Sequence, residues 1–235
     1  MFSQLPTSLW YARASHVDLL LGSPEHLQYA PPPPLTDDIR SVMVHGYFQH
    51  PAYFWHHRAL VRRLLMPASA RRAAAAAWGE FRRQALFQVT GPLVAVHVRL
   101  GDTSERGLGA QFYRSGVSAV MRRLRSRSAR PTCVLFSDDV EAVRGLADGI
   151  CDSAVVFDVG PLRDDLTMLV MASCCSGIVI SASTFSWWAA VLGAYKAVVA
   201  PLTVAPACSG SEANFTLGAV PGWSRLMVLC VRKKS

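Results

Sequence analysis

The sequence predicts an α/β protein built on a Rossmann-like parallel sheet with helices on both faces. Beyond Gly91-Pro92, short β-branched or apolar runs alternate with helix-forming stretches, the order that builds parallel sheets. The chain has 235 residues, 51% of them hydrophobic, enough for one or two globular domains with a real core. We expect a reduced, mainly helical N-terminal region at residues 1–91 and the Rossmann-like domain at residues 92–235.

The N-terminal region has few clear elements before residue 40, and Pro31 to Pro34 form a stiff extended break. A short strand is expected at Val42–Val44. An amphipathic helix is expected at Tyr53–Met66, followed by an alanine-rich helix at Ala68–Phe87. The apolar side of the amphipathic helix would carry Phe54, Leu60, Val61, Leu64 and Leu65.

The second region supplies the sheet. Its strands are expected at Val94–Arg99, Cys133–Phe136, Val155–Phe157, Ile178–Ile180 and Ala197–Ala200. The intervening helices are expected at Gln111–Arg127, Asp139–Ala147, Asp165–Cys174 and Phe185–Ala194. Ser, Gly and Pro punctuate the very apolar stretch from Leu166 to Ala207, so we interpret it as buried helices and strands and predict no transmembrane segment.

Composition limits the partners. The net charge is +8, so an anionic partner such as phosphate, nucleic acid or a membrane surface is plausible. The first twenty residues lack the apolar core of a cleavable signal peptide. The six cysteines show no metal-ligand spacing, and the sequence does not determine their redox state.

The most informative stretch runs from Gly177 to Gly193. The buried strand pattern Ile178–Ile180 is followed by four hydroxyl residues and then by a helix-forming segment. Unpaired amides and a positive dipole at a helix N-terminus favour a bound anion, so this junction is suited to hold phosphate. The alternative is that Ser183 or Thr184 only caps the helix and that the tryptophans belong to the core.

A second candidate site follows the strand at Val94–Arg99. The two-residue period places Val94, Val96 and Val98 on one face, with His97 and Arg99 on the other. An arginine at the carboxyl end of a parallel strand requires an anion, and its planar fork fits phosphate. The alternative is a structural ion pair between Arg99 and Asp102, with His97 in the core.

The next strand also ends in polar residues, Ser137-Asp138-Asp139. Ionised carboxylates only accept hydrogen bonds, so they suit ribose hydroxyls or guanine N–H groups. The alternative is that Ser137 or Asp138 caps the following helix. Because the carboxyl ends of parallel strands share one edge, the three strand ends together predict a nucleotide or sugar-nucleotide pocket.

These motifs resemble the α-1,2-fucosyltransferase family, the galactoside 2-L-fucosyltransferases and their bacterial relatives. The similarity covers roughly residues 44–230. It includes Gly46-Tyr47-Phe48-Gln49, His97-Val98-Arg99-Leu100-Gly101-Asp102, Phe136-Ser137-Asp138-Asp139, Ser183-Thr184-Phe185-Ser186-Trp187-Trp188-Ala189-Ala190 and Pro221-Gly222-Trp223. The resemblance implies a GT-B-like fold and transfer of L-fucose from GDP-fucose, with inversion and without a metal or other cofactor, to the 2-hydroxyl of a terminal galactose on a glycan.

The resemblance also assigns roles to individual residues. Arg99 would bind the diphosphate and stabilise the departing GDP, because negative charge builds on the leaving group. Asp102 is the candidate for the group that accepts or orients the acceptor proton, and a departing phosphate oxygen is the alternative. The phosphates would lie against Ser183, Thr184 and Phe185, and the nucleoside against His97, Asp138 and Asp139.

The chain departs from the family pattern at two motif positions, with Ala182 where the family has Asn and Leu100 where it commonly has Arg. The family's Gly-x-x-Gly-Asn-Gln segment and a membrane anchor are not visible either. We therefore expect a shortened or diverged N-terminal lobe. A second hypothesis is a non-catalytic sugar-nucleotide binder that kept the pocket and lost its acceptor contacts.

A third hypothesis is a nucleic-acid surface at Arg114, Arg122, Arg123, Arg125, Arg127 and Arg130. These arginines do not share one helix face and no aromatic residues interleave between residues 122 and 130 to stack bases, so a solvated basic helix is favoured. We expect no nucleic-acid partner. The compartment would be the Golgi in a eukaryote and the cytoplasm in a bacterium.

Overall fold

The centre of the molecule is a parallel sheet. The computed structural model describes residues 19–22, 42–45, 50–85, 91–100, 108–124, 130–160, 164–202, 220 and 222–227. The sheet strands are β3 (Leu93–Val98), β4 (Thr132–Ser137), β5 (Ala154–Val156), β6 (Gly177–Val179), β7 (Ala197–Leu202) and β8 (Ser224–Met227).

The strand order is β5-β4-β3-β6-β7-β8, and every neighbouring pair is parallel. The chain thus starts in the middle, builds outward to one edge, returns to the middle and builds to the other edge. This is the doubly wound Rossmann order. The predicted fold class is confirmed.

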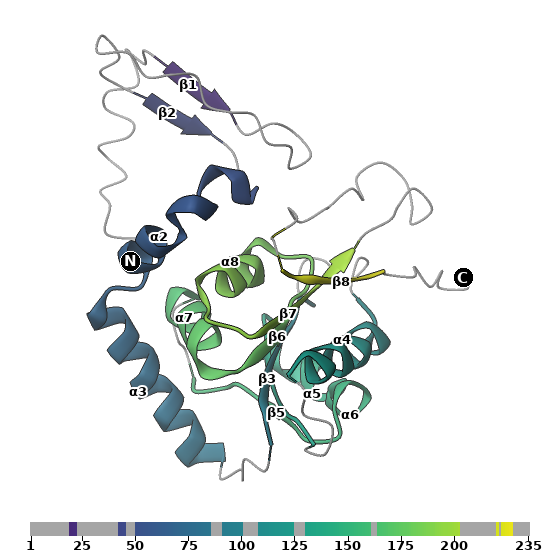
Figure 1. Ribbon diagram of the computed structural model, residues 1–235. Helices are drawn as coiled ribbons and strands as arrows, with labels where there is room; N and C mark the ends of the chain where they lie inside the picture. Colours follow the sequence, from purple (N-terminus) through teal and green to yellow (C-terminus); the bar gives the residue numbers. More distant parts are fainter. Residues whose placement is uncertain are drawn as a thin grey trace.

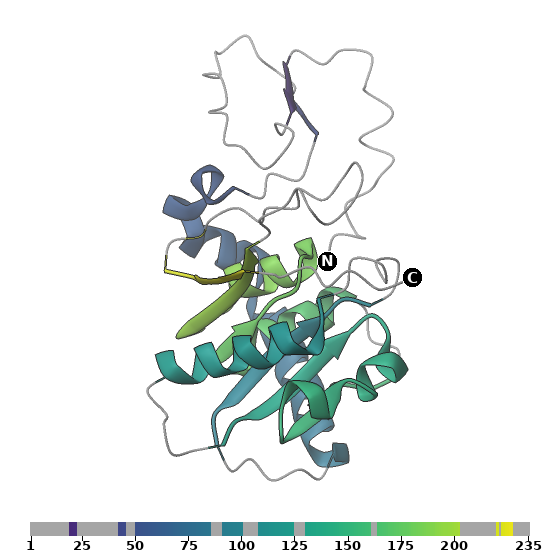
Figure 2. The same cartoon turned by 90° about the vertical axis from the view of Figure 1, so that its right-hand side faces the viewer.

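Helices cover both faces of the sheet, as Figure 1 shows. One face packs against α3 (Ala68–Ala85), α7 (Asp164–Cys174) and α8 (Thr184–Leu192). The other packs against α4 (Ala110–Arg123), α5 (Val140–Arg144) and α6 (Ala147–Ile150), with α4 in front of the sheet in Figure 2. Along β3, Val94, Val96 and Val98 face α4, whereas Ala95 faces the core that contains α7 and α8. The predicted alternation along this strand is confirmed.

The N-terminal elements differ from the prediction in detail. Strand β1 (Leu19–Gly22), which was not predicted, pairs in parallel with β2 (Val42–His45). The helix expected at Tyr53–Met66 is instead two short 3-10 turns, η3 (Pro51–Tyr53) and η4 (Trp55–His57), followed by α2 (Arg58–Leu65). Phe54 between the two turns has φ −144° and ψ −7°, outside the helical region. Its ring packs against Trp187 and Trp188 at centroid distances of 5.7 and 5.2 Å.

The prediction of which residues form the apolar side of α2 is also partly wrong. Leu60 and Leu64 are 41% and 63% exposed, whereas Val61 and Leu65 pack against the core. Arg58, at the start of the same helix, points inward. Its guanidinium donates to the carbonyl oxygens of Val191 and Gly193 at 3.0 and 2.8 Å. These are the carbonyls that the end of α8 leaves without helical partners, so Arg58 caps that helix.

Other differences are small. The helix expected at Asp139–Ala147 is divided into α5 and α6 by a turn at Gly145-Leu146. Strand β8 adds a sixth strand after the Pro-Gly-Trp segment, and it was not predicted. The helix, strand, helix, strand order predicted for the apolar stretch is confirmed by α7, β6, α8 and β7.

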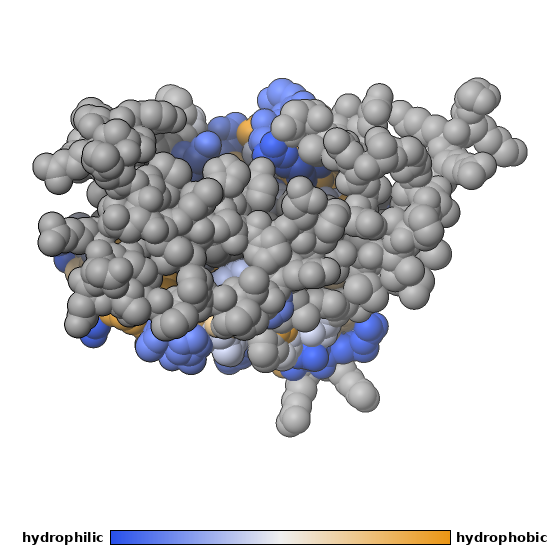
Figure 3. Space-filling view, turned by 90° about the horizontal axis from the view of Figure 1, so that it is seen from above, coloured by the Kyte–Doolittle hydropathy of each residue, from blue (hydrophilic) through white to orange (hydrophobic). Residues whose placement is uncertain are grey.

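The cysteines and the outer surface complete the description. Cys133 of β4 forms a disulfide with Cys151, which follows α6, and Cys174 and Cys175 are free. Where Figure 3 colours the surface seen from above, the described residues are mainly hydrophilic. No helix in the described ranges is long and apolar enough to cross a bilayer.

Helix α4 lies close to the sheet because both sides of their contact carry a glycine, Gly116 in the helix and Gly177 in β6. A Cβ atom at Gly116 of α4 would lie 2.6 Å from Cγ1 of Val179 in β6. A Cβ atom at Gly177 of β6 would lie 2.3 Å from Cγ1 of Val120 in α4. Both distances are shorter than real side chains tolerate, so any larger residue would push the helix away from the sheet.

This contact gives a stability prediction. The Gly116→Ala variant should lower the free energy of unfolding by about 1–3 kcal/mol, because overpacking outweighs the better helix propensity of alanine. The matched control is Gly79→Ala in α3, where the nearest atom to a new Cβ is 3.8 Å away. The free energy of unfolding of Gly79→Ala should rise by up to about 1 kcal/mol. Urea unfolding of both variants measures the difference, and a stabilised Gly116→Ala would contradict the packing described here.

Candidate functional site

The two halves of the sheet meet between β3 and β6, and their carboxyl ends carry the first two site residues. Nδ1 of His97, in β3, lies 2.6 Å from Oγ of Ser181, which follows β6. The side chains are buried, with His97 3% and Ser181 1% exposed. The chain leaves the sheet in opposite directions on the two sides of this point, and ligands of doubly wound sheets bind at such a switch point.

The hydroxyls after β6 have separate roles. Ser183 caps α8, since its Oγ accepts a hydrogen bond from the Phe185 amide at 3.3 Å. Oγ of Ser186 donates to the Ser183 carbonyl at 3.3 Å and lies 3.5 Å from Oγ of Ser181. Thr184 is the first residue of α8. The capping interpretation therefore describes Ser183, while Ser181 and Ser186 join His97 in a buried polar network.

Arg99 and Asp138 form the charged part of the site, at the ends of β3 and β4. Nε of Arg99 lies 3.1 Å from Oδ2 of Asp138, and the two side chains are 34% and 26% exposed. Oδ1 of Asp138 accepts a hydrogen bond from the Leu100 amide at 2.8 Å. Asp138 thus holds both the guanidinium and the backbone that carries it. Asp102, the partner proposed in the alternative interpretation, lies outside the described residues.

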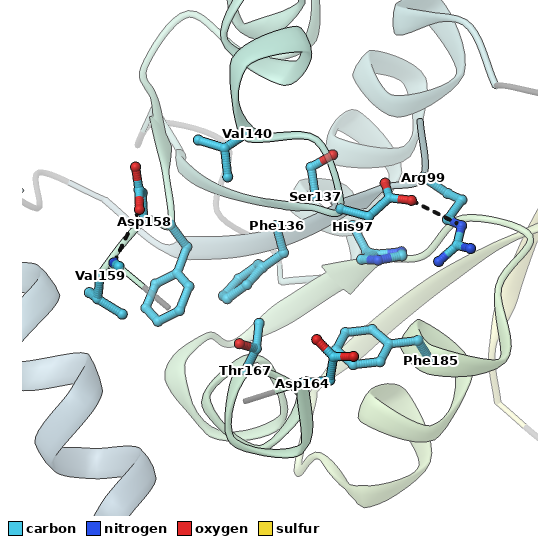
Figure 4. Close-up of a pocket in the computed structure, with 13 residues that line it drawn as sticks. His97, Arg99, Phe136, Ser137, Val140, Asp158, Val159, Asp164, Thr167 and Phe185 are labelled. Carbon is cyan, nitrogen blue, oxygen red and sulfur yellow. Dashed lines mark hydrogen bonds and ion pairs between the residues drawn. The ribbon is translucent and has the colours of Figure 1, made fainter. Parts of the chain in front are cut away.

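A cavity of about 290 Å³ opens beside these residues, at the carboxyl ends of β3, β4 and β5 (Figure 4). The start of α7 and Phe185 of α8 close its other side, and the Phe185 ring lies 5.5 Å from the imidazole of His97. The cavity is lined by His97, Arg99, Phe136, Ser137, Asp138, Val140, Phe157, Asp158, Val159, Gly160, Asp164, Thr167 and Phe185.

Four of the predicted site residues line this one cavity: His97, Arg99, Asp138 and Phe185. Asp139 does not line it. Oδ1 of Asp139 accepts from the Ala142 amide at 2.9 Å, so this carboxylate caps α5. The cap expected from the sequence at this strand end is Ser137 or Asp138, and the structure places it one residue later, at Asp139.

Sequence reasoning missed several lining residues that come from β5 and α7. Oδ1 of Asp158 accepts from the Gly160 amide at 3.2 Å, and Gly160 has φ +77°, a conformation that glycine adopts easily. Oδ2 of the same carboxylate pairs with Arg144 at 3.1 Å. Figure 4 shows the carboxylate of Asp164 beside the Phe185 ring, with Thr167 nearby. A polar residue after the strand at Val155–Phe157 was the available signal for Asp158.

Burial sets the charge of His97. Burial lowers the pKa of His97 to about 4: desolvation of the imidazole is the largest cause, the charge of Asp138 raises the pKa, and the charge of Arg99 lowers it. The imidazole is therefore neutral at physiological pH. The positive charge of the site comes from Arg99, not from His97.

Two of the arginines considered as a nucleic-acid surface, Arg114 and Arg123, hold neighbouring backbone instead. Arg114 donates to the carbonyl oxygens of Asp148 and Gly149 at the end of α6. Arg123 donates to the Gly222 carbonyl at 2.7 Å. These contacts favour the structural interpretation of the basic run.

Comparison with known proteins identifies the family. A sequence model described as glycosyl transferase family 11 matches residues 37–220. The chain belongs to glycosyl transferase family 11. This is the α-1,2-fucosyltransferase family, so the resemblance stated from the motifs is confirmed. No curated protein matches this sequence.

Among solved structures, the chain is similar to the crystal structure of the glycosyl transferase family 9 from Veillonella parvula DSM 2008. The two chains share 15% identity, with a TM-score of 0.42. The match covers 67% of this chain and 40% of that one.

The buried histidine gives a pH prediction. The pKa of an unfolded histidine is near 6.5 and that of the folded His97 is about 4, so between these pH values only the unfolded state of the protein takes up the proton. Its stability should therefore fall as the pH falls from 6.5 towards 4, by about 3 kcal/mol in total. A His97→Asn variant keeps a polar atom near the Nδ1 position but does not titrate.

Urea unfolding at pH 7 and pH 5 measures this effect. The wild type should lose more stability than His97→Asn between the two pH values, because the other histidines contribute equally to both proteins. Parallel losses in the two proteins would mean that His97 is not buried in its neutral form.

Proposed function

We propose that this protein transfers L-fucose from GDP-fucose to the 2-hydroxyl of a terminal galactose on a glycan, with inversion and without a metal ion. Membership of glycosyl transferase family 11 supports glycosyl transfer. The observation that carries the proposal is the convergence of His97, Arg99, Asp138 and Phe185 on one cavity at the switch point of the sheet. That position suits a nucleotide-linked donor.

The nucleoside would occupy the inner part of the cavity. Its apolar walls include the rings of Phe136, Phe157 and Phe185, which suit a planar base. The carboxylates of Asp158 and Asp164 also line it, and ionised carboxylates accept hydrogen bonds from ribose hydroxyls and from the N–H groups of guanine. Small-molecule sites commonly combine mostly apolar walls with a few fixed polar groups of this kind.

The diphosphate would lie near Arg99 and the N-terminus of α8, against Ser183 and Thr184. Asp138 fixes the guanidinium through Nε, so the arginine fork is oriented before the donor arrives. The positive end of the α8 dipole adds to its field. Because His97 is neutral, its role would be to support the Phe185 ring and to line the nucleoside rather than to neutralise phosphate.

In the reaction, the galactose 2-hydroxyl oxygen would attack the fucose anomeric carbon on the face opposite the diphosphate. The new C–O bond forms as the bond to the β-phosphate oxygen breaks, and its electron pair leaves with GDP. Arg99 stabilises the charge that develops on this oxygen. The hydroxyl proton passes to Asp102 or to a phosphate oxygen of the departing GDP.

The first prediction concerns donor binding. Replacing Arg99 with alanine should weaken GDP-fucose binding about 30-fold or more, since a fork that donates two charged hydrogen bonds contributes about 2–3 kcal/mol or more. Arg99→Lys should fall between this variant and the wild type because it keeps the charge and loses the fork. Calorimetry in the presence of a chelator measures affinity and metal independence together.

The matched control is Arg83→Ala, which removes an exposed arginine on α3 that does not line the cavity. Binding that is unchanged in Arg99→Ala would exclude this cavity as the donor site. Binding without fucose transfer to lactose or N-acetyllactosamine would favour the non-catalytic sugar-nucleotide binder.

A second prediction separates the two proton acceptors. If Asp102 is the base, Asp102→Asn should lower kcat about 10²- to 10⁴-fold while GDP-fucose affinity is unchanged. Initial rates of fucose transfer to lactose, measured with saturating donor, provide the test. Near-normal turnover would remove Asp102 from the mechanism and leave the phosphate oxygen as the acceptor.

A further inference from the structure

A second cavity lies at the opposite edge of the sheet from the donor site. Its volume is about 420 Å³, and it is bounded by α2, α3, the end of α7 and the residues that precede β6 and β7. A backbone hydrogen bond joins the two segments that precede β6 and β7, since the Lys196 amide donates to the Ser176 carbonyl at 3.0 Å. The lining is Arg62, Met66, Arg71, Ala74, Ala75, Trp78, Ala172, Ser173, Cys174, Cys175, Ser176, Ala194 and Lys196.

The charges in this lining are all positive. Arg62, Arg71 and Lys196 contribute three cations, and the lining contains no aspartate or glutamate. Within the described part of the chain, none of the three takes part in an ion pair. Helices α2 and α3, which form one wall, together carry seven arginines and one glutamate. The cavity therefore has a positive potential that an anion would neutralise.

One of these cations is held in an unfavourable state. Nε of Arg62 is buried and has no hydrogen-bond partner among the described residues. A buried donor without a partner is destabilising, and the great majority of such groups in folded proteins are paired. The guanidinium must turn toward the cavity for an anion there to supply the missing acceptor, because the Nε atom is not exposed to the cavity in this structure.

The remaining wall is apolar and partly aromatic. Trp78 lines the cavity, and its ring is fixed by Phe81 and Phe157 at centroid distances of 5.4 and 6.5 Å. Met66 and several alanines complete this side. A bare inorganic ion would leave this surface unused, whereas an anion attached to an apolar or aromatic group would cover it.

From these observations we infer that the cavity is a second binding site, for a small organic anion whose phosphate or similar group meets Arg62, Arg71 and Lys196 and whose apolar or aromatic body packs on Trp78. The site is separate from the donor cavity, because none of its lining residues lines that cavity. The inference does not depend on the proposed fucosyl transfer.

Calorimetry with three probes tests the chemistry: phenyl phosphate, inorganic phosphate and phenol. Phenyl phosphate should bind, inorganic phosphate should bind at least about tenfold more weakly, and phenol should show no binding. Arg71→Ala and Lys196→Ala should each weaken phenyl phosphate binding about tenfold. Both side chains belong to exposed residues, so these variants should fold. Arg82→Ala, on α3 but outside the lining, is the matched control and should bind like the wild type.

The two free thiols provide an independent readout. Cys174 and Cys175 line the cavity with their sulfur atoms 3.1 Å apart. Burial raises the pKa of the Cys175 thiol well above its usual value, so alkylation by N-ethylmaleimide should occur mainly at Cys174. Bound phenyl phosphate should slow this alkylation, measured by mass spectrometry, and Lys196→Ala should require a correspondingly higher phenyl phosphate concentration for the same protection.

Three outcomes would overturn the inference. Equal affinities for phenyl phosphate and inorganic phosphate would show that the apolar wall takes no part. Binding lost in Arg99→Ala but kept in Lys196→Ala would assign the probe to the donor cavity. The absence of binding, with Arg71→Ala and Lys196→Ala less stable than the wild type, would mean that these cations only complement the carbonyl end of α7.

Discussion

The hydrogen bond between His97 and Ser181 joins the two halves of the sheet at the point where the chain reverses its winding direction. It is made by two buried side chains, and neither can be removed without leaving the other polar group unpaired inside the protein. The same burial keeps the imidazole neutral. The proposed donor cavity begins at this bond, because the Phe185 ring packs on His97 and Arg99 follows two residues later on the same face.

An aromatic cluster connects this edge of the sheet with the rest of the molecule. The ring of Phe157, in the lining of the proposed donor cavity, lies 4.9 Å from the rings of both Phe136 and Phe81. Trp78, in the lining of the second cavity, stacks on Phe157 at 6.5 Å. Helix α3 therefore packs on the same aromatic group that lines the proposed donor cavity. The helix that precedes the sheet is part of the support for the site, and the boundary proposed at residue 91 remains a prediction.

The edge of the sheet that carries the site could be predicted from the sequence, because parallel strands place all their carboxyl ends together. His97, Arg99 and Asp138 follow from that rule alone. The contribution of Asp164 and Thr167 could not be predicted, since it depends on how α7 crosses the sheet. The different roles of Asp138 and Asp139 could not be predicted either, because a shift of one residue in the start of α5 changes which carboxylate caps it. The exposure of Leu60 and Leu64 escaped prediction because Phe54 breaks the expected helix and rotates its apolar face.

The distribution of charge between the two cavities follows from what each edge of a parallel sheet offers. At the carboxyl edge, helix N-termini already provide a positive field, so one arginine, held by Asp138, is enough to attract an anionic group. The lining there can also include carboxylates, which suit a nucleoside. At the amino edge, the helices end in carbonyl groups, and a site for an anion must overcome their negative field. Three cations without a single carboxylate in the lining do this, which is more positive charge than the end of one helix requires. This excess of positive charge is the physical reason to expect a bound anion in the second cavity.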